Sequence, residues 1–424
     1  MDTFRILGGQ RLAGRIAVNG AKNAALPVLT TCLMTRQPCC FHGLPLLRDV
    51  QTQVKILNTL GIETRWQGRS VHTRLRDDYN STAPYELLKT MRAGVCVLGP
   101  LLASRGQARV SLPGGCVIGE RPIDLHLRGL EALGAEIDIE HGYVQATAPI
   151  GGLRGAEIYL GGTWGSSVTA THNVMCAAAC ARGRTVIECA ACEPEVVDVA
   201  NCLNAMGARI SGAGSPRIII DGVRRLTGAD WKVIPDRIEA ATFVVLAAIT
   251  RSALTVTNCR PDHMLAFIHV MRQMGIDITV RGRRLEVAPS KRPRACEVVT
   301  LPYPAFPTDC QAQVMALACL ADGASVITER IYPDRFMHAA ELKRMGATIS
   351  IANAQAVIQG VRNLEGAEIM ASDLRASAAL VLAGLAAKGE TLLHRIYHID
   401  RGYERIEERL RRLGARIERI PTPA

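Results

Sequence analysis

The chain has 424 residues, of which 48% are hydrophobic and only 4% aromatic, and it carries a formal net charge of +11. This length exceeds what one hydrophobic core usually supports, and the aliphatic composition favours helices packed on sheets, so we expect two α/β domains. The basic residues are spread along the chain without an aromatic platform for base stacking. This argues against nucleic-acid binding and leaves a solvated basic surface or an anionic small substrate as explanations.

The sequence has the features of a protein of a reducing, aqueous compartment. No apolar run reaches membrane-spanning length and the first residues lack the pattern of a signal peptide, so we expect a soluble cytoplasmic protein, a monomer or weak homo-oligomer. The 14 cysteines are then expected to be reduced thiols. Cys189 and Cys192 have metal-ligand spacing, but no second pair completes a zinc pattern, and we expect neither a metal nor a cofactor.

One pattern recurs along the whole chain. A helix ends in Leu-Gly or Met-Gly, and a short segment of alternating hydrophobicity follows, with the glycines about 70 residues apart, as in an internal repeat. Glycine at a helix end adopts the left-handed conformation, and the alternation predicts a strand with one buried face. We therefore expect six α/β units, three in each domain, with a boundary at residues 231–235 and a ligand cleft between the domains. The glycines are Gly61, Gly134, Gly207, Gly275, Gly346 and Gly414.

The first segment of chemical interest follows a predicted strand at residues 14–18. A glycine turn leads into an apolar helix that begins with Lys22 and Asn23. A lysine beside the free N–H groups of a helix start favours an anion site, although the same residues also suit an ordinary helix start. The spacing of glycine and lysine differs from that of a P-loop.

A glycine-rich loop at residues 113–119 carries Cys116, in a setting unlike that of the cysteines in apolar helices. Its backbone has many accessible conformations, and Arg121 nearby would favour the thiolate. Two interpretations stay open. The segment is a surface loop with an incidental thiol, or it is a mobile lid that carries an acid or nucleophile.

Charged residues also stand at the ends of later elements. Asp309 follows a proline-rich approach at residues 303–307 and precedes an apolar helix, where it serves as a helix cap or as a base toward a substrate hydroxyl. Guanidinium groups bind phosphate and carboxylate through paired hydrogen bonds, although a single surface arginine more often forms a weak ion pair. The arginines at such ends are Arg92, Arg335, Arg375 and Arg401.

Together, these segments resemble the UDP-N-acetylglucosamine 1-carboxyvinyltransferases, a family of enolpyruvyl transferases. The resemblance implies two inverse α/β barrel domains, each made of three repeated α/β units with helices inside. The N-terminal domain would span residues 22–234 and carry the cysteine lid, and the C-terminal domain would combine residues 1–21 with residues 235–424. The matching segments occur in the same order as in the family, at residues 20–27, 112–125, 306–313, 335–346, 372–384 and 397–408.

The resemblance also implies a function. The enolpyruvyl group of phosphoenolpyruvate would pass to the 3-hydroxyl of UDP-N-acetylglucosamine, and phosphate would be released. This is the first committed step of peptidoglycan synthesis, which links the protein to cell-wall biogenesis, cell shape, the cell cycle and cell division. The reaction is an addition through a tetrahedral ketal followed by elimination, in which cationic side chains stabilise developing charge without a metal.

The resemblance also implies roles for individual residues. Cys116 matches the lid cysteine that donates a proton and can form a pyruvate adduct, and Asp309 matches the acid that deprotonates the sugar hydroxyl. Lys22 and Arg401 complete the implied catalytic set. The residues implied in binding phosphoenolpyruvate are Lys22, Asn23, Arg121, Arg375 and Arg401, and those implied in binding the UDP-sugar are Arg92, Arg121, Pro122, Ile123, Asp124, Leu125, Asp309 and Ile331.

Several positions depart from the family pattern. Arg48 stands at a usual lysine, Thr169 at a glycine that lets the backbone approach a diphosphate, and Gly165 at another lysine, while Ala241 and Ala305 stand at usual glycines. Because these changes concern the nucleotide side, an acceptor such as UMP stays an alternative, whereas the cysteine lid argues against shikimate 3-phosphate. A non-catalytic basic paralogue that binds nucleic acid or a regulator is a further alternative, disfavoured by catalytic-type residues at the matched positions.

Overall fold

The computed structural model describes residues 2–89, 91–112 and 123–421. These residues form two compact units. Unit 1 contains residues 2–19 and 235–421, and unit 2 contains the described residues between 20 and 234. The chain therefore passes between the units at Asn19/Gly20 and at Ile234/Pro235, whereas the boundaries expected from the sequence follow residues 21 and 234.

Each unit contains three four-stranded sheets that share one plan. In every sheet an edge strand runs parallel to its neighbour, and the other two strand pairs are antiparallel. The six repeated glycines have positive φ, from 81° to 100°. Each lies shortly before the strand at the antiparallel edge of its sheet. The predicted α/β repeat is thus confirmed.

The sheets of unit 1 use both ends of the chain, because the N-terminal strands pair with strands of the C-terminal half. In sheet order, the first sheet contains β22 (Glu368–Met370), β23 (Glu390–His394), β1 (Thr3–Leu7) and β24 (Arg416–Ile420); the second contains β16 (Ile278–Val280), β17 (Arg284–Val287), β15 (Ala253–Thr257) and β2 (Ala13–Ala17); and the third contains β18 (Glu297–Thr300), β19 (Ala324–Glu329), β21 (Gln355–Gln359) and β20 (Thr348–Ala352).

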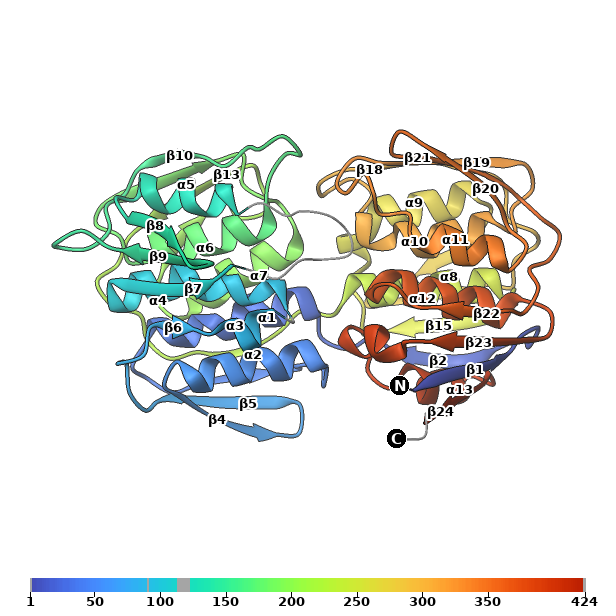
Figure 1. The fold of residues 1–424 in the computed structure, drawn as a ribbon, viewed down its shortest axis with the longest axis horizontal. Coiled ribbons are helices and arrows are strands. Elements are labelled where there is room, and N and C mark those ends of the chain that lie inside the picture. Colours follow the sequence, from blue (N-terminus) through green and yellow to red (C-terminus); the bar gives the residue numbers. More distant parts are fainter. Residues whose placement is uncertain (1, 90, 113–122, 422–424) are drawn as a thin grey trace. The chain divides into compact units, whose positions relative to one another are not determined.

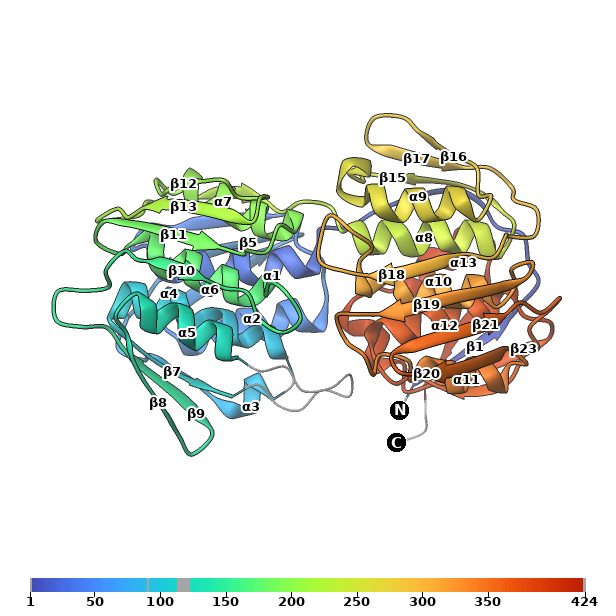
Figure 2. The same cartoon turned by 90° about the horizontal axis from the view of Figure 1, so that it is seen from above.

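Three inner helices of unit 1 contact one another within the sheets, as Figures 1 and 2 show. They are α8 (Arg237–Ile249), α10 (Gln311–Ala318) and α12 (Leu374–Ala386). The remaining helical segments are η3 (Pro261–Met264), α9 (Leu265–Gln273), η4 (Thr308–Cys310), α11 (His338–Arg344), η5 (Ile396–Arg401) and α13 (Ile406–Arg411).

Unit 2 repeats this plan. In sheet order, its sheets contain β10 (Glu157–Tyr159), β11 (Arg184–Glu188), β13 (Arg217–Asp221) and β12 (Arg209–Ser211); β14 (Asp230–Lys232), β3 (Cys39–His42), β5 (Ser70–Leu75) and β4 (Ile62–Gln67); and β6 (Thr82–Ala83), β7 (Gln107–Ser111), β9 (Tyr143–Thr147) and β8 (Glu136–Glu140). Its helical segments are α1 (Lys22–Thr30), η1 (Thr31–Met34), α2 (Arg48–Thr59), α3 (Tyr85–Leu88), η2 (Arg92–Val97), α4 (Leu98–Arg105), α5 (Asp124–Ala132), α6 (Val168–Ala179) and α7 (Pro194–Ala205).

The composition of the inner helices explains their position. All residues of α8 and α10 are buried, and a helix that is apolar on every side must be covered on every side. Polar groups concentrate at their starts instead. Asp236 caps α8 and Asp373 caps α12, each accepting two backbone N–H bonds. The charged side chains of α8, α10 and α12 thus lie in the first turn or just before it, and the rest of these helices is mainly apolar.

In the described part of the chain, no helix combines the length and the hydropathy that crossing a membrane requires.

Truncating an inner-helix leucine should destabilise unit 1 strongly. Leu246 of α8 is fully buried, whereas Leu265 of α9 is 67% exposed. Leu246→Ala should lower the free energy of unfolding by about 2–5 kcal/mol, because the helices around it cannot close the cavity. Leu265→Ala should change it by less than about 0.5 kcal/mol. Urea denaturation followed by circular dichroism measures both, and equal effects would contradict the inner placement of α8.

Candidate active site

Asp309 lies in the 3-10 turn that leads into inner helix α10. Its two oxygens accept from different guanidinium groups: Oδ1 from Arg335 Nη1 at 2.9 Å, and Oδ2 from Arg375 Nη2 at 3.2 Å. The Asp309 side chain is 25% exposed, whereas those of Arg335 and Arg375 are 6% and 2% exposed. The carboxylate is therefore the member of this cluster that a substrate can reach.

Arg375 stands in the first turn of α12 and carries a charge into the barrel interior. Its Nη1 donates to the hydroxyl of Tyr403 at 3.1 Å, and that hydroxyl lies 2.7 Å from Thr242 Oγ1. Burial disfavours the charged form, but Tyr403 and Asp309 outweigh burial and raise the pKa of Arg375 above its usual value. Its Nε is buried without a hydrogen-bond partner among the described residues. A buried charge of this kind depends on its few partners.

Arg335 ties the cluster to the loop after β19. Its Nη1 also donates to Thr308 Oγ1 at 3.0 Å, and that hydroxyl donates to Glu329 Oε2 at 2.8 Å. Oε1 of Glu329 accepts from the backbone N–H of Ile331 at 2.9 Å. The half-buried Ile331, expected near the UDP-sugar, is thus connected to Asp309 through three side chains.

Arg401 adds a further cation to this part of unit 1. It ends η5 and is half-buried. Burial and the charge of Arg401 lower the pKa of His398, against the opposing effect of Asp373. Because Asp373 caps the helix that carries Arg375 and also acts on Arg335, the three arginines belong to one electrostatic environment.

The anion site expected from the sequence would lie in unit 2, at the start of α1. Lys22 Nζ lies 3.3 Å from Asp49 Oδ2, and the two side chains are only 12% and 6% exposed. Asp49 is in the first turn of α2, so the lysine is held between two helix starts. Asn23 is half-buried, whereas Arg48, at one of the departures from the family pattern, is exposed.

The segment expected to bind the UDP-sugar begins α5. Asp124 is exposed, Ile123 half-buried and Leu125 buried. The next residue, His126, is buried, and its Nε2 lies 3.1 Å from Thr169 Oγ1 at the start of α6. Thr169 therefore has an internal partner in this chain, and the α5 and α6 starts are linked.

Part of the expected site lies outside the described residues. This holds for Cys116, Arg121 and Pro122, and for the side chain of Arg92, which begins η2. Their predicted roles stay predictions. Cys189 and Cys192 are half-buried, and in the described regions they belong to no group of three metal-ligating side chains.

Comparison with known proteins shows the family to which the chain is similar. The family model of EPSP synthase (3-phosphoshikimate 1-carboxyvinyltransferase) matches residues 6–410. A UDP-N-acetylglucosamine 1-carboxyvinyltransferase of Methylacidiphilum infernorum is 50% identical over 420 residues, which cover 99% of each chain. The chain belongs to this transferase family. A second member, from Desulfosudis oleivorans, is also 50% identical over 420 residues, covering 99% of this chain and 100% of the relative.

Solved structures share the fold. The enolpyruvyl transferase NikO from Streptomyces tendae superimposes with a TM-score of 0.90 at 23% identity, covering 100% of this chain and 99% of NikO. An EPSP synthase from Acinetobacter baumannii gives 0.77 at 20% identity, covering 99% and 100%. At these identities the likeness concerns fold alone. It confirms the enolpyruvyl transferase fold that the carboxyvinyltransferase resemblance implied.

Three residues that contact or support the candidate site residues were not predicted from the sequence. Asp49, Glu329 and Tyr403 contact or support Lys22, Arg335 and Arg375 respectively. Tyr403 lies inside a segment that matched the carboxyvinyltransferase family, and Asp49 directly follows Arg48, so both were near positions of interest. Nothing in their local sequence distinguishes them from ordinary surface or core residues.

Buried histidines should make unit 2 sensitive to acid. Burial lowers the pKa of His172 from 6.5 to about 4, despite the opposing charge of Glu195. Between these values the unfolded chain binds a proton that the folded chain does not, so stability present above pH 6.5 is lost as the pH falls. At pH 5 this amounts to about 2 kcal/mol for one histidine.

The variant His172→Leu should therefore lose about 2 kcal/mol less stability than the wild type between pH 7 and pH 5. The exposed His269 provides the control, and His269→Leu should leave the pH dependence unchanged. Urea denaturation at both pH values measures the difference. Identical pH slopes for all three proteins would refute a neutral buried His172.

Proposed function

We propose that this chain transfers the enolpyruvyl group of phosphoenolpyruvate to the 3-hydroxyl of UDP-N-acetylglucosamine and releases phosphate. The observation that carries the proposal is the accessible Asp309 carboxylate between the guanidinium groups of Arg335 and Arg375. A base beside fixed cations suits a reaction between a hydroxyl and an anionic phosphoester. Relatives of 50% identity that carry this enzyme name support the same pair of substrates.

The reaction is an addition followed by an elimination. Asp309 takes the proton of the sugar 3-hydroxyl while its oxygen attacks C2 of phosphoenolpyruvate, and Cys116 donates a proton to C3. The Cys116 thiolate then takes a proton back from C3 of the tetrahedral ketal, the bond from C2 to the phosphate oxygen breaks, and the leaving phosphate takes the proton held by Asp309. This restores the double bond and both side chains. Atoms and charges balance over the two steps, and each positioned acid or base contributes about 100- to 10,000-fold.

The cations bind and orient phosphoenolpyruvate in this proposal. Lys22, Asn23, Arg121, Arg375 and Arg401 would contact its phosphate and carboxylate. Asp49 holds the Lys22 ammonium and Tyr403 holds the Arg375 guanidinium, so both cations are fixed before the substrate arrives. Preorganised charges of this kind stabilise a transition state without reorganisation at the moment of reaction.

The UDP-sugar residues complete the proposal. Arg92, Arg121, Pro122, Ile123, Asp124 and Leu125 contact the nucleotide side, and Asp309 with Ile331 contacts the sugar. The His126–Thr169 hydrogen bond supports the segment at the start of α5. In the cell, the reaction is the first committed step of peptidoglycan synthesis and takes place in the cytoplasm, which connects the enzyme to cell-wall biogenesis and division.

The acceptor decides between this proposal and its alternatives. Phosphate release from phosphoenolpyruvate should be fastest with UDP-N-acetylglucosamine, and should be at background with UMP or shikimate 3-phosphate. A preference for UMP would change the acceptor in the proposal but leave the proposed enolpyruvyl transfer unchanged. No release with any acceptor, together with salt-sensitive binding of nucleic acid, would favour the non-catalytic alternative.

The carboxylate of Asp309 has its own test. Asp309→Asn keeps the shape of the side chain but removes the base, so kcat should fall about 100- to 10,000-fold with a smaller change in KM. Asp322, with 78% of its side chain exposed, supplies the control, and Asp322→Asn should retain wild-type kcat. Steady-state phosphate release measures both. Full activity of folded Asp309→Asn would remove Asp309 from the proposed mechanism.

A further inference from the structure

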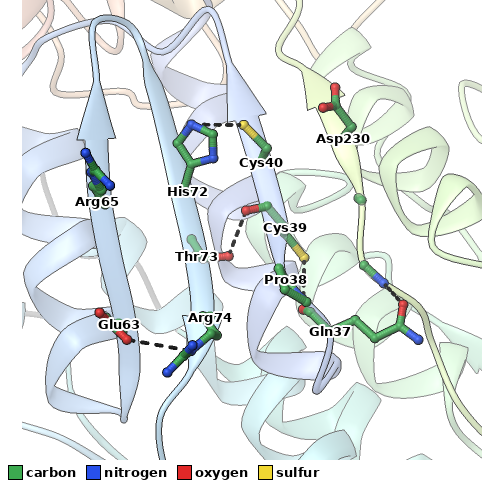
Figure 3. A pocket seen from close by; sticks show the side chains of 12 residues that line it. Gln37, Pro38, Cys39, Cys40, Glu63, Arg65, His72, Thr73, Arg74 and Asp230 are labelled. Carbon is green, nitrogen blue, oxygen red and sulfur yellow. Dashed lines mark hydrogen bonds and ion pairs between the residues drawn. The ribbon is translucent and has the colours of Figure 1, made fainter.

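A second group of chemically active side chains lies within unit 2, on the sheet formed by β14, β3, β5 and β4. Strand register places Cys40 directly between Asp230 of β14 and His72 of β5. Cys39 and Phe41 are buried, so the alternating residues Cys40 and His42 occupy the opposite face of β3. Figure 3 shows Cys40 and His72 side by side, with Asp230 on the adjacent strand.

The distances among these side chains suit a metal ion. Cys40 Sγ lies 3.7 Å from His72 Nε2 and 3.9 Å from His42 Nδ1, and His42 Nε2 lies 3.0 Å from Asp230 Oδ1. One ligand atom from each of Cys40, His42 and Asp230 falls within 4.8 Å of the other two. Zinc bonds of about 2.0–2.3 Å in tetrahedral geometry separate ligand atoms by roughly 3.3–3.7 Å. His42 faces Cys40 with Nδ1 and Asp230 with Nε2, so side-chain rotation would be needed to bring one of its nitrogens and the other ligand atoms to zinc spacing.

The surroundings leave the group accessible. It borders a hollow of about 590 Å³ that Glu63, Arg65 and Arg74 also line (Figure 3). The thiol and His42 are half-buried, and Asp230 is exposed. Access of this kind allows an ion to enter without opening the core. None of the four residues takes part in the reaction proposed above.

The ligand types select a class of metal. A thiolate with imidazoles favours Zn²⁺ and related ions over Mg²⁺ or Ca²⁺, which prefer oxygen ligands. We propose that Cys40, His42, His72 and Asp230 form a binding site for one thiophilic divalent cation, foremost Zn²⁺. The site differs from the spacing-based candidate Cys189 and Cys192, because it is assembled by strand pairing rather than by a short motif.

The ion would have a structural effect. β14 is a three-residue edge strand, and it directly precedes the point at Ile234 and Pro235 where the chain leaves unit 2. Ligands from β14, β3 and β5 would join three strands of one sheet, so the bound metal would stabilise the edge of that sheet against opening.

The test is metal binding to the full chain in the absence of substrates, which keeps it separate from the catalytic proposal. Equilibrium dialysis against Zn²⁺, with metal analysis, should give one equivalent per chain. Replacement by Co²⁺ should give a thiolate charge-transfer absorption. Cys40→Ser should abolish this absorption and weaken binding at least about tenfold, and His42→Ala should weaken binding by a similar factor.

Two cysteine variants provide matched controls. Cys192→Ser and Cys116→Ser should keep both the stoichiometry and the Co²⁺ absorption of the wild type. If Cys40→Ser fails to fold, His42→Ala together with His72→Ala takes its place in the comparison. Absence of stoichiometric binding in the wild type would overturn the proposal, as would binding that persists in Cys40→Ser or His42→Ala but disappears in Cys192→Ser or Cys116→Ser.

Discussion

The buried guanidinium of Arg375 is the constraint on which the rest of unit 1 depends. A charge with 2% side-chain exposure is tolerated only where fixed partners offset the loss of water. Asp309 at the start of α10 and Tyr403 after η5 are those partners. Their positions require α10, α12 and η5 to pack in one arrangement, so the same contacts that neutralise the charge also set the geometry of the candidate active site.

The two units apply one principle to place chemistry in an apolar barrel. The inner helices of unit 1 are largely hydrophobic, and their charged side chains lie in the first turn or just before it, where backbone N–H groups lack helical partners. Lys22 begins α1, Asp309 precedes α10, and Arg375 lies in the first turn of α12. In the proposed mechanism, enolpyruvyl transfer needs fixed cations and a base around a small anion, and residues at these helix starts would supply both.

Features that repeat along the chain, and residues that stand beside a helix start, could be predicted from the sequence. The glycines before the edge strands carry a conformational signal of their own, and Asp309 and Arg375 stand at element ends. Partners distant along the chain carry no such signal. Arg375 and Asp309 are 66 residues apart, and His42 and Asp230 are 188 residues apart. Only helix packing and strand register bring these pairs together, so neither Tyr403 nor the cysteine–histidine group could be recognised from local pattern.

A double-mutant cycle on the Arg375–Asp309 pair tests the central claim most directly. The free energies of unfolding of Arg375→Met, Asp309→Asn and the double variant are compared with that of the wild type at pH 7. Asp309→Asn leaves the buried Arg375 guanidinium without its carboxylate partner, so we expect it to lose about 3 kcal/mol. Arg375→Met leaves Asp309 its contact with Arg335 and should lose less, and the double variant should lose less than the sum of the two by about 1–3 kcal/mol. Losses that add within about 0.5 kcal/mol would show that the pair does not hold the helices together.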